Sequence, residues 1–158
     1  MGLKLGFAAA LCAASMVVAM PAAQAATGGT GAAELVRKLD IMLMVSSLRC
    51  RFTADSFQTD YADFSSSHLS ELNDANSTLM ADLARGVGSA DGQRALDRLS
   101  TSMANQYGQG HPWLDCSELK RVTRELADER QPGALLLAAE ELLDDHIAYG
   151  RVSLDADY

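Results

Sequence analysis

The most apolar stretch of the chain outside its N-terminus runs from Leu39 to Phe52, with the sequence LDIMLMVSSLRCRF. Apolar residues recur there every three or four positions, which predicts an α-helix. The other faces are also largely apolar, and such a helix is expected to be covered by neighbours on several sides. We therefore expect a central helix that begins at Ala32 and turns these positions inward: Leu35, Leu39, Met42, Val45, Leu48 and Phe52.

A second helix is expected to reach Leu83, although no glycine or proline separates it from the first. One uninterrupted helix over 32–83 would be about 78 Å long, which is implausible for a compact domain. Asp55 and Gln58 fit the N-cap and N3 positions of a capping box, so we place a turn from Arg51 to Asp55. The inward positions are Phe57, Tyr61, Phe64, Leu69, Leu72, Leu79 and Leu83.

The glycines from Gly86 to Gly92 are expected to form a linker between helices. They do not make a nucleotide-binding loop, because the third glycine of G-x-G-x-x-G is missing and no strand precedes them. A third helix follows and ends before Gly108, which suits the position after the C-cap. Its inward face carries Leu96, Leu99, Met103 and Tyr107.

Two further helices complete the expected fold. Asp115 as N-cap and Glu118 at N3 form a capping box at the start of the fourth helix. Pro132 suits the first position of a fifth helix, which ends at Gly150. The inward positions of the two are Leu119, Val122, Leu126, Leu135, Leu136, Ala139, Leu142, Leu143 and Ile147. No stretch alternates with the period of a strand, so we expect an all-α, single-domain bundle of about five helices.

Residues 1–25 have the features of a secretory signal peptide. Lys4 supplies a positive charge, an uncharged apolar run extends from Leu5 to Met20, and residues 23–25 match an A-x-A cleavage site. The run is shorter than the ~20 residues that span a bilayer. We expect a flexible leader at 26–31, a helical domain at 32–150 and a disordered tail at 151–158. The protein would be periplasmic or secreted, with no stable membrane insertion after cleavage.

The charge of the chain limits its partners. The 158 residues carry a net charge of −8, and removal of the signal with Lys4, its only charged side chain, leaves −9. Nucleic acids and anionic membranes attract clustered lysine and arginine. We therefore expect neither as a partner, and expect a small anion or an envelope protein instead.

Cys50 and Cys116 are the two cysteines that follow the signal. In an oxidising compartment they most simply form one disulfide, enclosing a loop of 66 residues. Two buried free thiols are the alternative.

Motifs for metals, cofactors and catalysis are weak. His68 and Glu71 are spaced i,i+3, and His146 follows an acidic run, but neither matches H-E-x-x-H or the paired Glu-x-x-His of helical di-metal sites. A solvated acidic helix face is the favoured interpretation of both. No G-x-S-x-G nucleophile elbow is present. We expect no metal and no cofactor, and we assign no catalytic residue.

The loop from Asn105 to Cys116 is the candidate binding site. A disulfide brings its two Cα atoms within about 7 Å, so the arginines that flank Cys50 would lie close to this loop. Arginine beside an aromatic wall is a common way to hold a carboxylate or phosphate. The candidate binding residues are Arg49, Arg51, Tyr107, His111, Trp113 and Asp115.

A structural role for the same residues is left open. In that interpretation Trp113 drops into the core beside the disulfide and pins the loop. The two arginines would then pair with Asp55 and Asp115 and steady the helix ends.

Three segments together resemble a known family: LDIMLMVSSLRCRF at 39–52, SSHLSELN at 66–73 and ALDRLSTSMANQYGQGHPWLDCSEL at 95–119. The family comprises small exported helical proteins of sphingomonad-type Alphaproteobacteria, without established function. Its members often carry the label S-adenosyl-L-homocysteine hydrolase. That enzyme uses an NAD-binding Rossmann domain, whose fingerprint and strands are missing here, so the sequence does not support the label. The resemblance implies an exported helical fold and supplies no catalytic residues.

Three functions stay open at this point. The first is a non-enzymatic binding or interaction protein of the cell envelope, with an unknown ligand or partner. The second is a small periplasmic stress chaperone, similar in outline to acid-stress chaperones that are short, helical and hold one disulfide. The third is an enzyme acting at the Trp113 loop.

Overall fold

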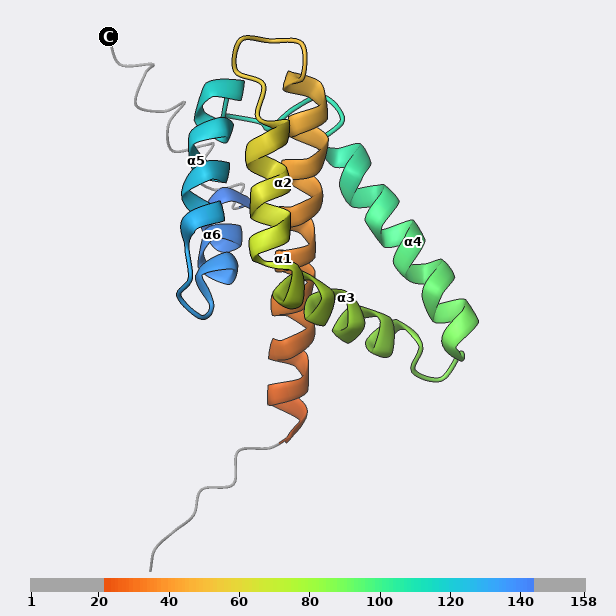
Figure 1. The fold of residues 1–158 in the computed structure, drawn as a ribbon. Helices are drawn as coiled ribbons and strands as arrows, with labels where there is room; N and C mark the ends of the chain where they lie inside the picture. Colours follow the sequence, from red (N-terminus) through yellow and green to blue (C-terminus); the bar gives the residue numbers. More distant parts are fainter. Residues whose placement is uncertain (1–21, 144–158) are drawn as a thin grey trace, which may run out of the picture.

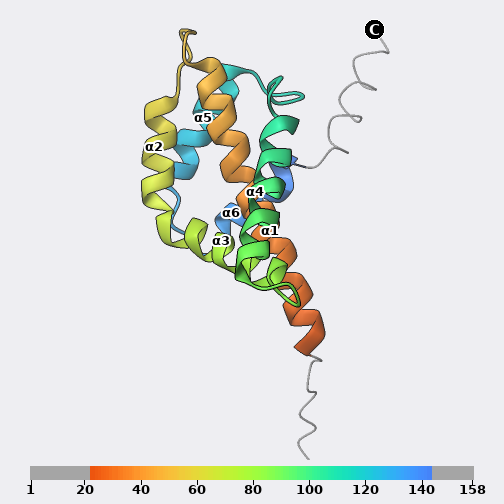
Figure 2. The same ribbon diagram turned by 90° about the vertical axis from the view of Figure 1, so that its right-hand side faces the viewer.

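In the computed structural model, which describes residues 22–143, helix α1 (Ala22–Cys50) runs through the middle of the molecule (Figures 1 and 2). The other helices pack on it from several sides. Leu39, Met42 and Leu43 of α1 are fully buried. The prediction of a central helix covered by its neighbours is confirmed.

The start of α1 differs from the prediction. The helix begins at Ala22, ahead of Ala32, so residues 26–31 are helical where a flexible leader was expected. Alanines stand on both sides of these residues, and alanine has the highest helix propensity. Residues 1–21 and 144–158 lie outside the described part of the chain. The apolar run of the predicted signal peptide, the predicted helix end at Gly150 and the predicted tail at 151–158 therefore lie outside it too.

The row of apolar residues that α1 turns toward the core ends before Leu48. Leu48 and Phe52 were both predicted to face inward, but they are 45% and 86% exposed. Cys50 is buried and bonded to Cys116 at the start of α5. Two residues along a helix rotate the side chain by about 200°, so the bond at Cys50 turns Leu48 to the opposite side. Phe52 lies beyond the helix end, in the turn that follows.

The predicted second helix is two helices in the structure, α2 (Gln58–Ser67) and α3 (Leu69–Leu83), separated at His68. His68 is buried, and its Nε2 lies 2.8 Å from the carbonyl oxygen of Leu126 on α5. The bond holds this residue against α5, while α3 turns away from the axis of α2 (Figure 1). The solvated face predicted around His68 is therefore wrong for His68 itself, and Leu69 is exposed where an inward position was predicted.

The start of α2 also differs from the prediction, because it lacks the expected side-chain cap. The turn between α1 and α2 is present where it was expected. The capping box of Asp55 and Gln58 is not formed, because α2 has Phe57 at its N-cap and no side chain caps it. Phe57 is fully buried, so the entry into α2 is fixed by apolar packing.

Helices α4 (Ser89–Gln106), α5 (Cys116–Asp128) and α6 (Ala134–Leu143) correspond to the last three predicted helices. The capping box of α5 is confirmed: the Asp115 side chain accepts from the backbone N–H groups of Ser117 and Glu118, and Glu118 accepts from the N–H of Asp115. Pro132 does not begin α6. Gly133 follows it with φ of 81°, a left-handed conformation that favours glycine, and the helix begins after that residue.

One apolar core joins all six helices of residues 22–143. Its fully buried members outside α1 include Phe57, Phe64, Leu135 and Ala139. No helix in this part of the chain combines the length and the apolar character needed to cross a membrane.

Candidate functional site

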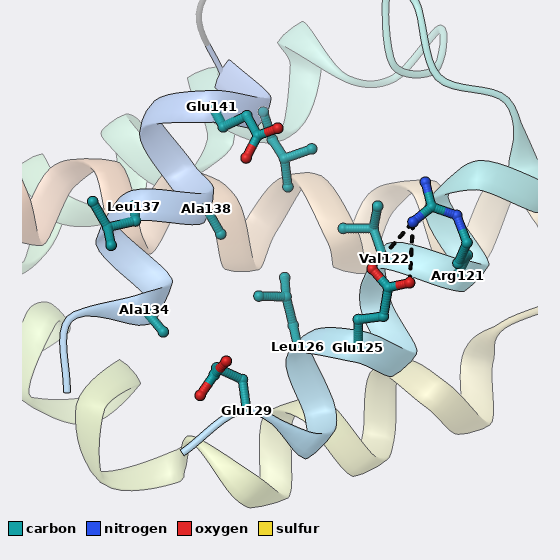
Figure 3. A pocket seen from close by; sticks show the side chains of 10 residues that line it. Arg121, Val122, Glu125, Leu126, Glu129, Ala134, Leu137, Ala138 and Glu141 are labelled. Carbon is teal, nitrogen blue, oxygen red and sulfur yellow. Dashed lines mark hydrogen bonds and ion pairs between the residues drawn. The ribbon is translucent and has the colours of Figure 1, made fainter. Parts of the chain in front are cut away.

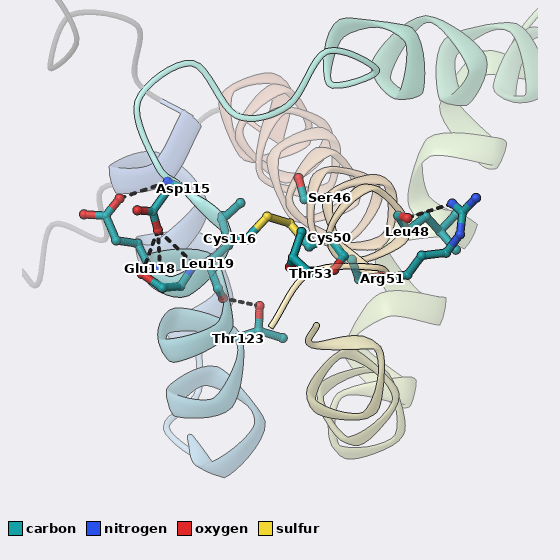
Figure 4. Close-up of a disulfide and its surroundings, with 12 residues drawn as sticks. Ser46, Leu48, Cys50, Arg51, Thr53, Asp115, Cys116, Glu118, Leu119 and Thr123 are labelled. Atoms are coloured by element: carbon teal, nitrogen blue, oxygen red, sulfur yellow. Dashed lines mark hydrogen bonds between the residues drawn. A yellow bond between two sulfur atoms is a disulfide. The ribbon is translucent and has the colours of Figure 1, made fainter. Parts of the chain in front are cut away.

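The disulfide between Cys50 and Cys116 joins the C-terminal end of α1 to the N-terminal end of α5 (Figure 4). The two Cα atoms are 5.8 Å apart. The predicted pairing is confirmed, and it brings the end of the central helix against the loop that precedes α5.

A cavity of about 240 Å³ lies beside this disulfide. Helix α1 lines it with Ser46 and Arg49, and the loop lines it with Gln109, Gly110 and His111. Asp115 and Leu119 complete the wall at the start of α5. Three of the predicted binding residues, Arg49, His111 and Asp115, therefore meet at one cavity.

Arg49 is held against the backbone of the loop. Its Nη1 donates to the carbonyl oxygen of Gly108 at 2.9 Å. Gly110 has φ of 108°, and a Cβ atom placed there would lie 3.3 Å from Arg49 Nε. The guanidinium therefore lies against the backbone of Gly108 and Gly110. Backbone contacts of this kind fix a cation in place before any ligand arrives.

Arg51 does not belong to this site. Its Nη1 donates to the carbonyl oxygen of Leu48 at 2.8 Å, and its guanidinium lies 4.4 Å from the ring centroid of Phe52. Figure 4 shows Arg51 on the side of α1 opposite to Asp115. Arg51 lies beyond the end of α1 at Cys50, in the turn that follows, so its side chain does not continue the helix face that carries Arg49. Among residues 22–143, neither arginine forms an ion pair with Asp55 or Asp115, so the alternative pairing is wrong as well.

His111 ties the loop to α6. Its Nε2 lies 3.0 Å from the carbonyl oxygen of Leu142, which can only accept, so Nε2 carries the proton. Its Nδ1 then accepts from the backbone N–H groups of Trp113 at 3.5 Å and Leu114 at 3.2 Å. Burial lowers the pKa of His111, which keeps the ring neutral. Both ring nitrogens are therefore engaged in hydrogen bonds that stabilise the conformation of the loop.

The two other aromatic residues predicted for the site stand behind His111 and do not line the cavity. Trp113 is half-buried and meets the His111 ring edge-on, with centroids 4.6 Å apart. Tyr107 is buried and stacks on the His111 ring with centroids 6.2 Å apart, and Lys38 Nζ lies 5.9 Å from the Tyr107 ring centroid. Trp113 is thus not the fully buried core anchor of the structural interpretation, but its ring can sense changes at His111.

Asp115 gives the cavity a fixed negative charge. Its pKa is lowered by hydrogen bonds from the backbone N–H of Glu118 and from the side chain and backbone of Ser117. The carboxylate stays ionised and caps α5. The cavity therefore presents one arginine and one carboxylate, which do not pair with each other within 4.0 Å.

Sequence reasoning missed a buried polar cluster between α1, α2 and α4. Tyr61 donates to Asp40 Oδ1 at 2.9 Å, and Arg37 Nη1 donates to Asp40 Oδ2 at 3.1 Å. Arg37 also reaches Ser100 of α4, at 3.4 Å. Burial raises the pKa of Asp40, and burial together with the nearby Asp40 carboxylate raises the pKa of Tyr61. The sequence feature that could have indicated this cluster is Asp40, an acidic residue within the apolar segment 39–52.

Possible metal-ligating side chains do not gather in one place among the described residues. No group of three or more histidine, cysteine, aspartate or glutamate side chains there could hold a metal ion. His68 Nδ1 lies 3.9 Å from Glu71 Oε2, as the i,i+3 spacing implies. His146, the other histidine beside an acidic run, lies outside the described residues.

Comparisons with protein-family models, with curated proteins and with solved structures found no match to this chain. The resemblance to an exported helical family therefore stays a prediction.

Proposed function

We propose that the protein is a non-enzymatic binding protein of the cell envelope that holds a small organic anion in the cavity beside Cys50–Cys116. One observation carries the proposal: Arg49 is hydrogen-bonded to the Gly108 carbonyl and lies close to Gly110 at the wall of that cavity. A fixed guanidinium can form forked hydrogen bonds to a carboxylate with little loss of side-chain freedom.

The other charge at the cavity narrows the class of anion. Asp115 is ionised and lines the same space as Arg49. A doubly charged phosphate would meet the Asp115 carboxylate as well as the arginine, whereas a single carboxylate can contact Arg49 alone. The proposed ligand is therefore a singly charged carboxylate, small enough for about 240 Å³.

The state of His111 supports binding over catalysis. A general base needs a ring nitrogen that faces the substrate. Both nitrogens of His111 are hydrogen-bonded to backbone groups of the protein itself. Among the described contacts, none favours an enzyme at the Trp113 loop.

Export is part of the proposal and rests on two observations. The first is the signal-like pattern of residues 1–25. The second is the disulfide, since such bonds persist in oxidising compartments.

The test is a screen of the purified, oxidised protein against small carboxylates and phosphates, followed by thermal unfolding and Trp113 emission. A ligand that prefers the folded state raises the melting temperature. Arg49→Gln should abolish the response, and Arg51→Gln is the matched control because it removes an equal charge two residues away without touching the cavity. Phosphates as effective as carboxylates, or equal losses in the two variants, would contradict the proposal.

One observation favours a stress chaperone as the second candidate. Met44 and Leu48 are exposed on one side of α1, four residues apart, and the exposed Phe52 lies four residues further on, in the turn after the helix. Such a stripe could bind apolar segments of unfolded proteins. Dye binding that rises on acidification, with suppression of aggregation of a model client, would support this function. Leu48→Ser should remove both effects, and a variant that keeps them would count against the stripe.

A further inference from the structure

A second cavity, further along α5 toward its C-terminal end, opens between α5 and α6 (Figure 3). It has a volume of about 410 Å³, and both helices rest on α1. We call it the α5–α6 groove. Its floor is apolar and includes Val122 and Leu126 of α5, which point into the gap in Figure 3. Leu137 of α6 lines it while remaining 68% exposed.

The rim of the groove is acidic. Glu125, Glu129 and Glu141 all line it. Glu125 is held by Arg121, whose Nη1 lies 3.0 and 3.1 Å from its two carboxylate oxygens. Within residues 22–143, no lysine or arginine lies within 4.0 Å of the Glu129 or Glu141 carboxylates.

Glu129 is fixed as an anion. Its Oε1 accepts from the backbone N–H groups of Arg130 and Gln131, each at 2.7 Å. These bonds lower the pKa of Glu129. The groove thus combines an apolar floor, one exposed leucine and two carboxylates that form no ion pair with the lysines and arginines of residues 22–143.

We propose that the α5–α6 groove docks a basic amphipathic helix of a partner protein. The apolar face of that helix would lie on Val122, Leu126 and Leu137. Its lysine or arginine side chains would reach Glu129 and Glu141. An amphipathic helix in an apolar groove is a recurring mode of recognition, and complementary charge sets its orientation and its partner.

Charge excludes two other occupants. Residues 144–158 carry Asp144, Asp145, Asp155 and Asp157 against a single Arg151, so this segment repels the acidic rim. A second copy of the chain, with a net charge of −8, is acidic as well. A basic partner is the occupant whose charge complements Glu129 and Glu141.

The test measures binding of a labelled peptide by fluorescence anisotropy, using the purified full chain. The probe is a helix of about 18 residues with leucines along one face and lysines elsewhere. Its counterpart has glutamate in place of every lysine. The lysine peptide should bind, and more weakly at about 200 mM than at about 50 mM salt, and the glutamate peptide should not.

Matched variants locate the binding. Leu137→Ser should weaken it by at least about tenfold, whereas Leu69→Ser alters a leucine of similar exposure outside the groove and should not. Glu141→Gln should weaken it by about threefold, whereas Glu140→Gln changes the preceding residue, which does not line the groove. Leu137 is largely exposed, so the fold should persist, and circular dichroism checks this.

Three results would overturn the proposal. One is absence of binding at millimolar peptide. Another is binding that Leu137→Ser and Leu69→Ser weaken equally, since the peptide would then adhere outside the groove. The third is protection of residues 144–158 from hydrogen exchange that Leu137→Ser removes, because the chain's own tail would then be the occupant.

Discussion

His111 Nε2 lies 3.0 Å from the carbonyl oxygen of Leu142, so one neutral side chain joins the loop before α5 to the last described turn of α6. Protonation would place a hydrogen on Nδ1, which now accepts from two backbone N–H groups. The relationship makes the conformation of this loop sensitive to acid.

The first prediction concerns pH. Burial lowers the pKa of His111, so the unfolded chain binds the proton more readily than the folded one. The contribution of His111 to stability is then complete above its unfolded pKa of about 6.5 and is lost as pH falls toward the lower folded value. Urea unfolding between about pH 7.5 and about pH 5.5 should show a falling free energy of unfolding.

The control for this prediction is His111→Gln, which can still donate to Leu142 but does not titrate. Its free energy of unfolding should depend less on pH over the same window. An unchanged pH dependence would show that other groups govern it.

The second prediction concerns the buried cluster of α1. Asp40→Ala leaves Arg37 and the Tyr61 hydroxyl without their acceptor. The free energy of unfolding should drop by about 2–4 kcal/mol. This is less than the loss expected for a fully buried ion pair, because the Arg37 side chain keeps some contact with water. Tyr61→Phe should lose about 1–2 kcal/mol. Glu125→Ala breaks the exposed pair with Arg121, and its loss should stay within about 1 kcal/mol. Similar losses of unfolding free energy for all three variants would show that the buried cluster contributes no more to stability than an exposed ion pair.

The third prediction concerns the disulfide. Releasing a loop of 66 residues by Cys50→Ser should lower stability by about 4 kcal/mol in the chain-entropy model. The melting temperature should fall by roughly ten degrees or more.

The intact mass of the exported protein should correspond to a start at Ala26 and lack two hydrogens. Two free thiols after export would contradict the bond.

The fourth prediction concerns the contact between α3 and α4. Gly92 is buried, and a Cβ atom placed there would lie 2.7 Å from Ala84 Cβ and 2.8 Å from its Cα. Gly92→Ala should therefore destabilise the protein by about 1–3 kcal/mol, despite the better helix propensity of alanine. Gly31→Ala is the matched helical control, with open space around the new atom, and should stabilise by about 0.5–1 kcal/mol. Thermal unfolding of both variants tests this prediction. A higher melting temperature for Gly92→Ala would contradict it.

The sequence was most informative where structure depends on local chemistry. The capping box of Asp115 and Glu118 follows from side chains three residues apart, and it forms as predicted. The central helix follows from apolar periodicity, and it is buried as predicted. The disulfide follows from the cysteine count, because only one pair remains after the predicted signal peptide.

Contacts between distant segments were beyond the same reasoning. The break at His68 depends on a hydrogen bond to Leu126, a residue on another helix. The orientation of Arg49 depends on the backbone of Gly108 and Gly110, and its divergence from Arg51 depends on where α1 ends. Spacing along the chain placed both arginines near the loop, but only the fold shows which one reaches it.

The bond between Cys50 and Cys116 also divides the chain topologically. It closes a covalent ring that contains α2, α3 and α4, while α1 and the α5–α6 pair leave the ring as two arms from adjacent points. A protease that nicks the linker between α3 and α4 therefore leaves one molecule, whose pieces separate only after reduction. A nick between α5 and α6 lies on an arm and frees the C-terminal fragment from covalent attachment at once.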